Sequence, residues 1–226
     1  MPQVPLKRTP IAMSDFARGL LRAWRAELGD LPSKQASGVL WAQYMIETGG
    51  AACWNWNIGN VKVTPAQVAA GVDWFDLPGT WEIINGVRTT LVAGDPGRRF
   101  RAYTSLDDAM VEHLKFLRNR RYKVAWPAVE AGDVMDFARR LKAAGYFTAS
   151  AEDYGGGMMW HYRRWLGSTV YENERDAIEM LQDAPTEPEL PDEPDPDSTK
   201  VVTWDIIHPK VPLRGDPEND DDPEAA

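Results

Sequence analysis

The last part of the chain limits how much of it can fold. Nine of the 17 prolines lie between Pro185 and Pro223, and residues 183–226 carry 14 acidic and 3 basic side chains, a net charge of −11. Such a segment cannot bury enough apolar surface to form a core. We therefore expect an N-terminal arm over residues 1–13, a folded domain over residues 14–182, and an extended or disordered acidic tail over residues 183–226.

One apolar stretch interrupts this tail. Residues 201–207 read VVTWDII, between acidic and proline-rich sequence. An apolar stretch of this length within a charged tail is typical of a docking segment. It could bind the chain's own domain or a partner protein, and the sequence leaves both open.

The charge of the folded part excludes some functions. Residues 1–182 carry 22 basic and 20 acidic side chains, a net charge of +2, so the total of −9 is due to the tail. A nucleic-acid binder would show a basic stripe, and we expect none. One cysteine and three separated histidines do not provide the ligands of an ordinary zinc site, and we expect no metal or cofactor. Residues 1–21 lack the apolar run of a signal peptide, and we expect no membrane span, because no segment is long and apolar enough.

Apolar periodicity predicts a mostly helical domain. Helix signals cover five segments. The first is Ser14–Leu28, and the second has Ser33 as its N-cap and ends before Gly49-Gly50. The third begins at Ser105 and Asp108, which resemble a capping box, the fourth runs from Asp133 to Gly145, and the fifth is Trp160–Leu166. Between them, Trp81–Ile84 and Val87–Val92 flank Asn85-Gly86, a strong signal for a β-hairpin. The predicted fold class is α+β, mostly α, with a helical body and a small β-hairpin lobe.

Glu47 is the residue with the clearest chemical potential. It lies in the last turn of the second predicted helix, beside the apolar stripe that includes Val39 and Leu40. The negative end of the helix dipole, partial desolvation and the faces of Trp54 and Trp56 would all raise its pKa. A carboxyl group that keeps its proton near neutral pH can act as the general acid that cleaves a glycosidic bond.

Four motifs in order, over about residues 36–165, resemble the glucosaminidase family of peptidoglycan hydrolases (glycoside hydrolase family 73). The motifs are ETGG with WNWNIGNVK at residues 47–62, TWEIING at residues 80–86, FRAYTS at residues 100–105, and AGYFT at residues 144–148 followed by Tyr154. Trp56 stands where the family usually has the first of two asparagines. The resemblance implies a lysozyme-like fold with a cleft between the helical body and the hairpin lobe.

The resemblance also implies an activity and a set of site residues. The chain is expected to cleave β-1,4 glycosidic bonds between GlcNAc and MurNAc in peptidoglycan, with Glu47 as general acid. Among Asp73, Asp76, Glu82 and Asp95, Glu82 is the expected second carboxylate because its hairpin matches the family motif. Tyr146 would donate a hydrogen bond or orient the substrate near Glu47. The expected substrate-binding residues are Asn57, Trp54, Trp56, Trp81 and Tyr154.

Two alternatives belong to other classes. The chain could be a non-catalytic lysozyme-like module that binds glycan or builds part of a phage tail or secretion machine. It could also be an amidase with Cys53 as nucleophile and His113 as base. Against the amidase, Cys53 follows a helix rather than opening one, and a reactive thiolate is favoured at the positive end of a helix.

The expected place of action is the bacterial cell wall. Without a signal peptide, an enzyme of the bacteriolytic endolysin kind would reach the wall by holin release, on a virion or through a secretion apparatus. The acidic tail would then dock on a phage-tail or secretion-machine protein.

Overall fold

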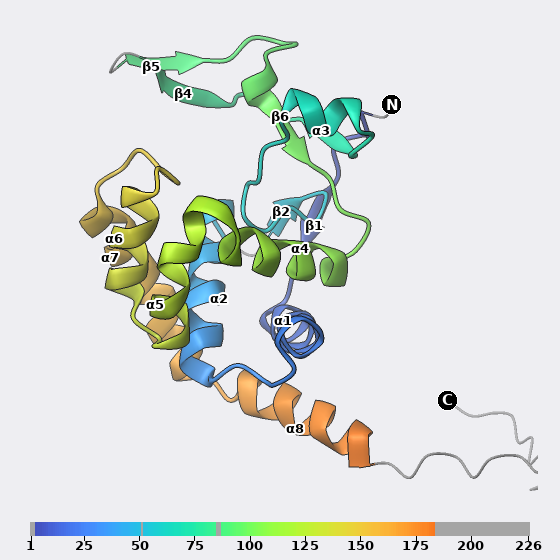
Figure 1. Cartoon of the computed structure of the whole chain (residues 1–226), viewed down its shortest axis with the longest axis vertical. Helices are drawn as coiled ribbons and strands as arrows, with labels where there is room; N and C mark the ends of the chain where they lie inside the picture. Colours follow the sequence, from blue (N-terminus) through green and yellow to red (C-terminus); the bar gives the residue numbers. More distant parts are fainter. Residues whose placement is uncertain (1–2, 51, 85–86, 184–226) are drawn as a thin grey trace, which may run out of the picture. The chain divides into compact units, whose positions relative to one another are not determined.

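The computed structural model describes residues 3–50, 52–84 and 87–183 (Figure 1). Backbone contacts divide the chain into the units Met1–Ala184 and Pro185–Ala226. The docking segment expected at residues 201–207 lies outside the described residues. The helices are α1 (Met13–Leu28), α2 (Lys34–Thr48), α3 (Pro65–Ala69), α4 (Leu106–Arg118), α5 (Trp126–Glu130), α6 (Val134–Ala143), α7 (Ala151–Leu166) and α8 (Val170–Asp183), with 3-10 helices η1 (Pro96–Arg98) and η2 (Arg120–Ala125).

Six short strands form three antiparallel pairs. They are β1 (Arg8–Pro10) with β2 (Ala52–Trp54), β3 (Trp74–Asp76) with β6 (Arg99–Arg101), and β4 (Trp81–Ile84) with β5 (Val87–Thr90). The expected fold class, α+β and mostly α, is confirmed. The expected hairpin is present, with Trp81 opposite Thr90 and Ile84 opposite Val87, although Asn85 and Gly86 lie outside the described residues.

Helix α2 is the central helix of this unit. Ser33 caps its start by accepting a hydrogen bond from the Ala36 amide at 3.0 Å, and Gly49 ends it in the left-handed conformation, as the sequence predicts. The sequence predicted that only one face of this helix is buried, and this is wrong, because every residue from Ala36 to Tyr44 is buried. A helix that is covered on all sides lies within a core rather than on its surface. Its last turn, with Glu47, is therefore set close to the core.

Helix α7 packs along α2 through aromatic rings. Trp165 stacks on Trp41 with ring centroids 5.7 Å apart, and Phe16 from α1 meets Trp41 edge-on at 5.1 Å. Helix α7 also packs on α6, and α1 packs on α4 and α8. The helices thus share one apolar core with α2 at its centre.

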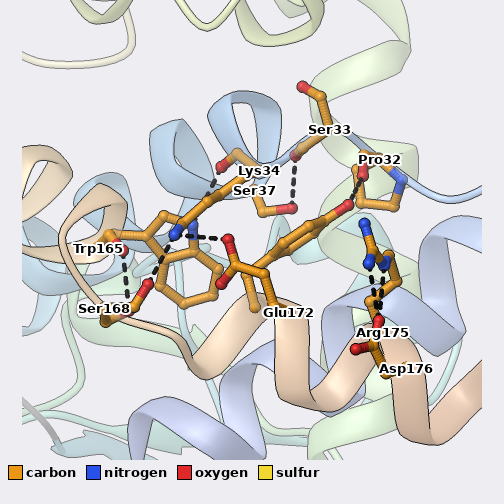
Figure 2. Close-up of polar contacts among 10 residues, drawn as sticks. Pro32, Ser33, Lys34, Ser37, Trp165, Ser168, Glu172, Arg175 and Asp176 are labelled. Carbon is orange, nitrogen blue, oxygen red and sulfur yellow. Dashed lines mark hydrogen bonds and ion pairs between the residues drawn. The ribbon is translucent and has the colours of Figure 1, made fainter.

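Polar contacts fasten the first turn of α2 to α7 and α8 (Figure 2). The Lys34 ammonium donates to the Ser168 carbonyl at 2.6 Å and to Glu172 Oε1 at 2.7 Å, while the Trp165 indole donates to the Lys34 carbonyl at 3.0 Å. The Tyr171 hydroxyl donates to the Pro32 carbonyl. The start of α2 is therefore held at its backbone and at its side chain.

Two parts of the helical region differ from the expectation. The helix expected at Trp160–Leu166 begins earlier, at Ala151, and includes three consecutive glycines. Helix α8 was not expected, because the sequence assigned no element to residues 170–183. Within the residues that the structure describes, no helix is both long and apolar enough to cross a membrane.

The expected N-terminal arm contains a strand. Thr9 of β1 is buried opposite Cys53, and the Asn55 amide nitrogen donates to the Pro5 carbonyl at 2.9 Å. Residues 3–10 therefore support the loop that follows α2. This support matters because the same loop reaches Glu47.

Candidate active site

Glu47 is held by two side chains from distant parts of the chain. The Tyr154 hydroxyl, in the first turn of α7, donates to Glu47 Oε1 at 2.7 Å. The Asn60 amide nitrogen lies 3.4 Å from Glu47 Oε2 and also donates to the Glu47 backbone carbonyl. Glu47 keeps part of its surface open to solvent. The carboxyl group is thus oriented by the protein and still accessible.

Burial determines the protonation of this carboxyl group. The surrounding protein raises the pKa of Glu47 to about 7, although the hydrogen bonds from Tyr154 and Asn60 act in the opposite direction. Desolvation penalises the charged form, whereas a donor stabilises it, and here desolvation is the larger effect. Glu47 can therefore carry a proton near neutral pH.

The loop that carries Asn60 has an unusual backbone. Asn55, Trp56 and Asn60 have positive φ values of 48°, 58° and 48°. A residue with a side chain pays about 1–2 kcal/mol in this region, and asparagine tolerates it best. At Asn60 this conformation accompanies the contacts of its amide with Glu47. Strain of this kind is often found at functional sites.

Asn57, expected to bind substrate, is used inside the loop. Its amide nitrogen donates to the carbonyls of Val61 and Arg101, both at 2.9 Å, and its amide oxygen accepts from the Val61 amide at 2.8 Å. Asn57 is 1% exposed. It fixes the turn, and Asn60 is the amide that reaches Glu47. The sequence pattern contained Asn60 within the same motif, but its spacing did not distinguish the two asparagines.

The two tyrosines make different contacts from those that the sequence suggested. Tyr146, expected to donate near Glu47, donates to the Gly59 carbonyl at 2.9 Å. Tyr154, expected only to bind substrate, makes the direct bond to Glu47, and its ring stacks on Phe147 at 3.9 Å between centroids. Burial, with the Glu47 charge, raises the pKa of both tyrosines, so both hydroxyls are neutral donors.

Glu82, the expected second carboxylate, lies on β4 and forms an ion pair with Lys62. Lys62 follows Asn60 by two residues, so the segment that contacts Glu47 also contacts Glu82. Two other candidate carboxylates serve the structure: Asp76 pairs with Arg98, and Asp95 accepts from the Gly97 amide at 2.7 Å. Glu82 is paired as well, and it differs from the other two in that its partner belongs to the segment that holds Asn60.

The tryptophans differ in position. Trp81 is 44% exposed with the Arg88 guanidinium 4.2 Å from its ring centre. Because adjacent residues of a strand point to opposite faces, Trp81 and Glu82 cannot both face one site. Trp54 is half-buried in β2. Trp56 packs partly against the core and lines a depression of about 220 Å³ with Arg22 and Leu106, and Glu47 is not among the residues that line it.

The expected alternative of a Cys–His amidase is contradicted. Cys53 is 2% exposed, its sulfur lies 3.0 Å from Thr9 Oγ1, and burial raises the pKa of the thiol. A nucleophilic cysteine needs a lowered pKa. His113 bonds instead to Gln43 Oε1 at 3.1 Å, and burial lowers its pKa to about 4. Both side chains are parts of the core.

Comparison with known proteins gives little. No family model matches the chain, and no curated protein matches it. A crystal structure of a peptidoglycan hydrolase mutant from Sphingomonas sp. A1 matches with 22% sequence identity and a TM-score of 0.45, over 73% of this chain and 99% of that chain. A likeness of this degree identifies neither a family nor an activity, so function rests on the geometry around Glu47.

The described residues contain no group of three or more His, Cys, Asp or Glu side chains arranged to hold a metal ion. What they do contain is a carboxyl group whose pKa burial raises to about 7, a tyrosine hydroxyl that donates to it, and a further carboxylate, Glu82, on β4. These groups can donate a proton, accept one, and bind hydroxyl or amide groups of a neutral polar substrate.

Proposed function

We propose that this protein is a glycoside hydrolase that cleaves β-1,4 bonds of peptidoglycan, with Glu47 as general acid. The observation that carries the proposal is the partly accessible Glu47 carboxyl group, whose pKa burial raises to about 7. A general acid works best when its pKa lies near the working pH, because it is then both protonated and able to release its proton.

In this mechanism, protonated Glu47 donates its proton to the glycosidic oxygen that leaves. The electron pair of the broken carbon–oxygen bond remains on that oxygen, and positive charge develops on the sugar ring. Tyr154 stabilises the resulting Glu47 carboxylate, because its hydroxyl already donates to Oε1. Glu82 is proposed as the second carboxylate, which stabilises the ring charge or activates a water molecule.

The substrate follows from the sequence motifs and is part of the proposal. The resemblance to glucosaminidases favours cleavage of the bond between GlcNAc and MurNAc. Analysis of the reducing ends in digested wall would identify which of the two sugars carries the new reducing end. Action at the bacterial cell wall, and delivery by a virion or secretion apparatus, are likewise proposed from the sequence.

The test is loss of wall hydrolysis in Glu47→Gln. Gln has nearly the same volume as Glu but cannot donate an acidic proton, so we expect the rate to fall by about 10²-fold or more. Clearing of purified wall suspensions measures the rate, and thermal melting confirms the fold. Glu152→Gln, an exposed change in the first turn of α7, is the matched control and should keep full activity.

Full activity in folded Glu47→Gln would disprove the assignment. Binding of the wild-type protein to wall without clearing would instead favour the non-catalytic glycan-binding module. Activity on chitin oligomers alone would overturn the peptidoglycan substrate. In Glu82→Gln, a folded protein with unchanged rate would remove Glu82 from the mechanism.

A further inference from the structure

Gln43 is a buried polar residue beneath the candidate acid. It is 0% exposed and lies on α2 four residues before Glu47. Residues at this spacing share one face of a helix, one turn apart. A buried amide needs hydrogen-bond partners, because a buried polar group without a partner costs about 1–3 kcal/mol. The partners of Gln43 therefore indicate why an amide occupies this position.

One end of the Gln43 amide is fixed by α4. His113 Nε2 lies 3.1 Å from Gln43 Oε1. Because its pKa is lowered to about 4, His113 is neutral at pH 7 and can donate through Nε2 to this oxygen. The ring has little freedom, since a Cβ atom on Gly59 would lie only 2.5 Å from His113 Cε1.

The other end of the amide is a buried donor. Gln43 Nε2 has no partner of full hydrogen-bond geometry among the described residues. It belongs to the residue one turn before Glu47, whose Oε1 accepts from the Tyr154 hydroxyl at 2.7 Å. The Gln43 side chain also acts to lower the pKa of Tyr146 and Tyr154, against the larger effect of burial, as a donor to their oxygens would.

We propose that Gln43 is a positioning residue that holds the Tyr154 hydroxyl against Glu47. His113 fixes the Gln43 oxygen, which directs the amide nitrogen to the tyrosine oxygen, and the Tyr154 hydrogen is then directed to Glu47 Oε1. A hydroxyl that accepts one hydrogen bond becomes a better donor in the next. The inference concerns the carboxyl group of the proposed function, but its test needs no substrate.

Glu47 itself is the reporter in this test. The groups that act on its protonation are Tyr154 from α7 and Asn60 from the loop after β2, together with burial. Tyr146 lies near enough for the Glu47 charge to raise its pKa. Removing the Tyr154 donor will raise the pKa of Glu47, because this hydrogen bond lowers it.

The experiment compares Gln43→Met, Tyr154→Phe and the double variant in the full chain. Titration of the Glu47 carboxyl group by NMR, assigned with Glu47→Gln, gives the pKa. We expect Gln43→Met to raise it by less than Tyr154→Phe does, and to add nothing in the double variant. Ser37→Ala is the control, because Ser37 is buried on the same helix and donates only to the Ser33 carbonyl at 2.9 Å. It should leave the pKa unchanged.

A pKa shift from Gln43→Met that persists in the Tyr154→Phe background would overturn the proposal, as would no shift in a folded single variant. If Gln43→Met does not fold, His113→Phe removes the group that orients the amide and should raise the pKa of Glu47 in the same direction. If Gln43→Met raises the pKa of Glu47 as expected but the wild-type protein does not hydrolyse wall, the proposed function is disproved and this inference stands. Hydrolysis that is lost in Glu47→Gln, with no shift in Gln43→Met, would disprove this inference alone.

Discussion

At the residue scale, the protonation of Glu47 links the site to stability. The folded pKa of about 7 exceeds the ordinary value of 4.5, so between these pH values the folded state binds more protons than the unfolded state. The stability contributed by this group is fully present below pH 4.5 and is lost as pH rises through 7. Above that, the ionised carboxyl costs up to about 3 kcal/mol.

Glu47→Gln should therefore stabilise the protein more at high pH than at low pH. We expect little change in melting temperature at pH 4, where both side chains are neutral, and an increase of several degrees at pH 8.5. Calorimetry at the two pH values measures the difference, with Glu152→Gln as control. An equal change at both pH values would show that Glu47 titrates like an exposed carboxyl.

The sequence predicts the position of Glu47 well and its neighbours poorly. Desolvation was expected from the apolar stripe and is the largest cause of the raised pKa. The sequence did not predict the hydrogen bonds from Asn60 and Tyr154, which lower this pKa. Tyr154 reaches Glu47 only because α7 begins at Ala151 and packs on α2, which local patterns do not contain.

At the element scale, the glycines of α2 and α7 show why α7 was only partly predicted. Glycine lowers helix propensity by about 1 kcal/mol, so three in succession argue against a helix. A Cβ on Gly157 would lie 2.8 Å from Ile46 Cδ1, and one on Gly155 would lie 2.7 Å from Met135 Sδ. Close approach of α7 to α2 and α6 thus outweighs propensity. Helix α8 was missed although its Tyr171 and Ile178 join the apolar core, and polar contacts such as Lys34–Glu172 also hold it.

Two glycine-to-alanine changes separate propensity from packing. A Cβ on Gly156 would meet nothing within 4 Å, so Gly156→Ala should raise the free energy of unfolding by about 0.5–1 kcal/mol. A Cβ on Gly38 of α2 would lie 2.8 Å from Trp165 Cδ1 and 2.9 Å from the Tyr162 ring. Gly38→Ala should therefore lower the free energy of unfolding by about 1–3 kcal/mol. Urea unfolding measures both, and the same sign in both variants would contradict this packing.

The sequence alone could have shown that Trp81 and Glu82 of the hairpin do not face the same site. Trp81 and Glu82 are adjacent in a strand, so period-two alternation places them on opposite faces. The hairpin was predicted from Asn85-Gly86, yet Glu82 was expected to take part in catalysis and Trp81 to bind the same substrate. Only the contact of Glu82 with Lys62 identifies the face that lies nearer the Glu47 loop.

At the scale of the whole molecule, we propose that Pro185–Ala226 is dispensable for chemistry. The side chains that hydrogen-bond to Glu47, Asn60 and Tyr154, and the Gln43–His113 pair beneath it all lie between Gln43 and Tyr154. Attraction between exposed charges is screened within about 8–10 Å at physiological salt, which disfavours inhibition by the acidic tail. A chain that ends at Ala184 should hydrolyse soluble wall fragments at the wild-type rate, and so should Trp204→Ala.

The measurements are the hydrolysis rates and melting curves of both variants. We expect truncation to remove binding to a delivery partner. A folded, truncated chain without activity would show that the active domain extends past Ala184, and that the proposed boundary is misplaced.

The attachment of α8 has a mechanical consequence. Lys34, which holds Glu172 at the start of α8, stands at the opposite end of α2 from Glu47, about 20 Å away at 1.5 Å per residue. Tension applied to the chain after Asp183 would pass along α8 to α1, to the C-terminal end of α7 and to this remote end of α2. The protein could therefore be pulled by its C-terminal side while the carboxyl group and its tyrosine kept their relative positions.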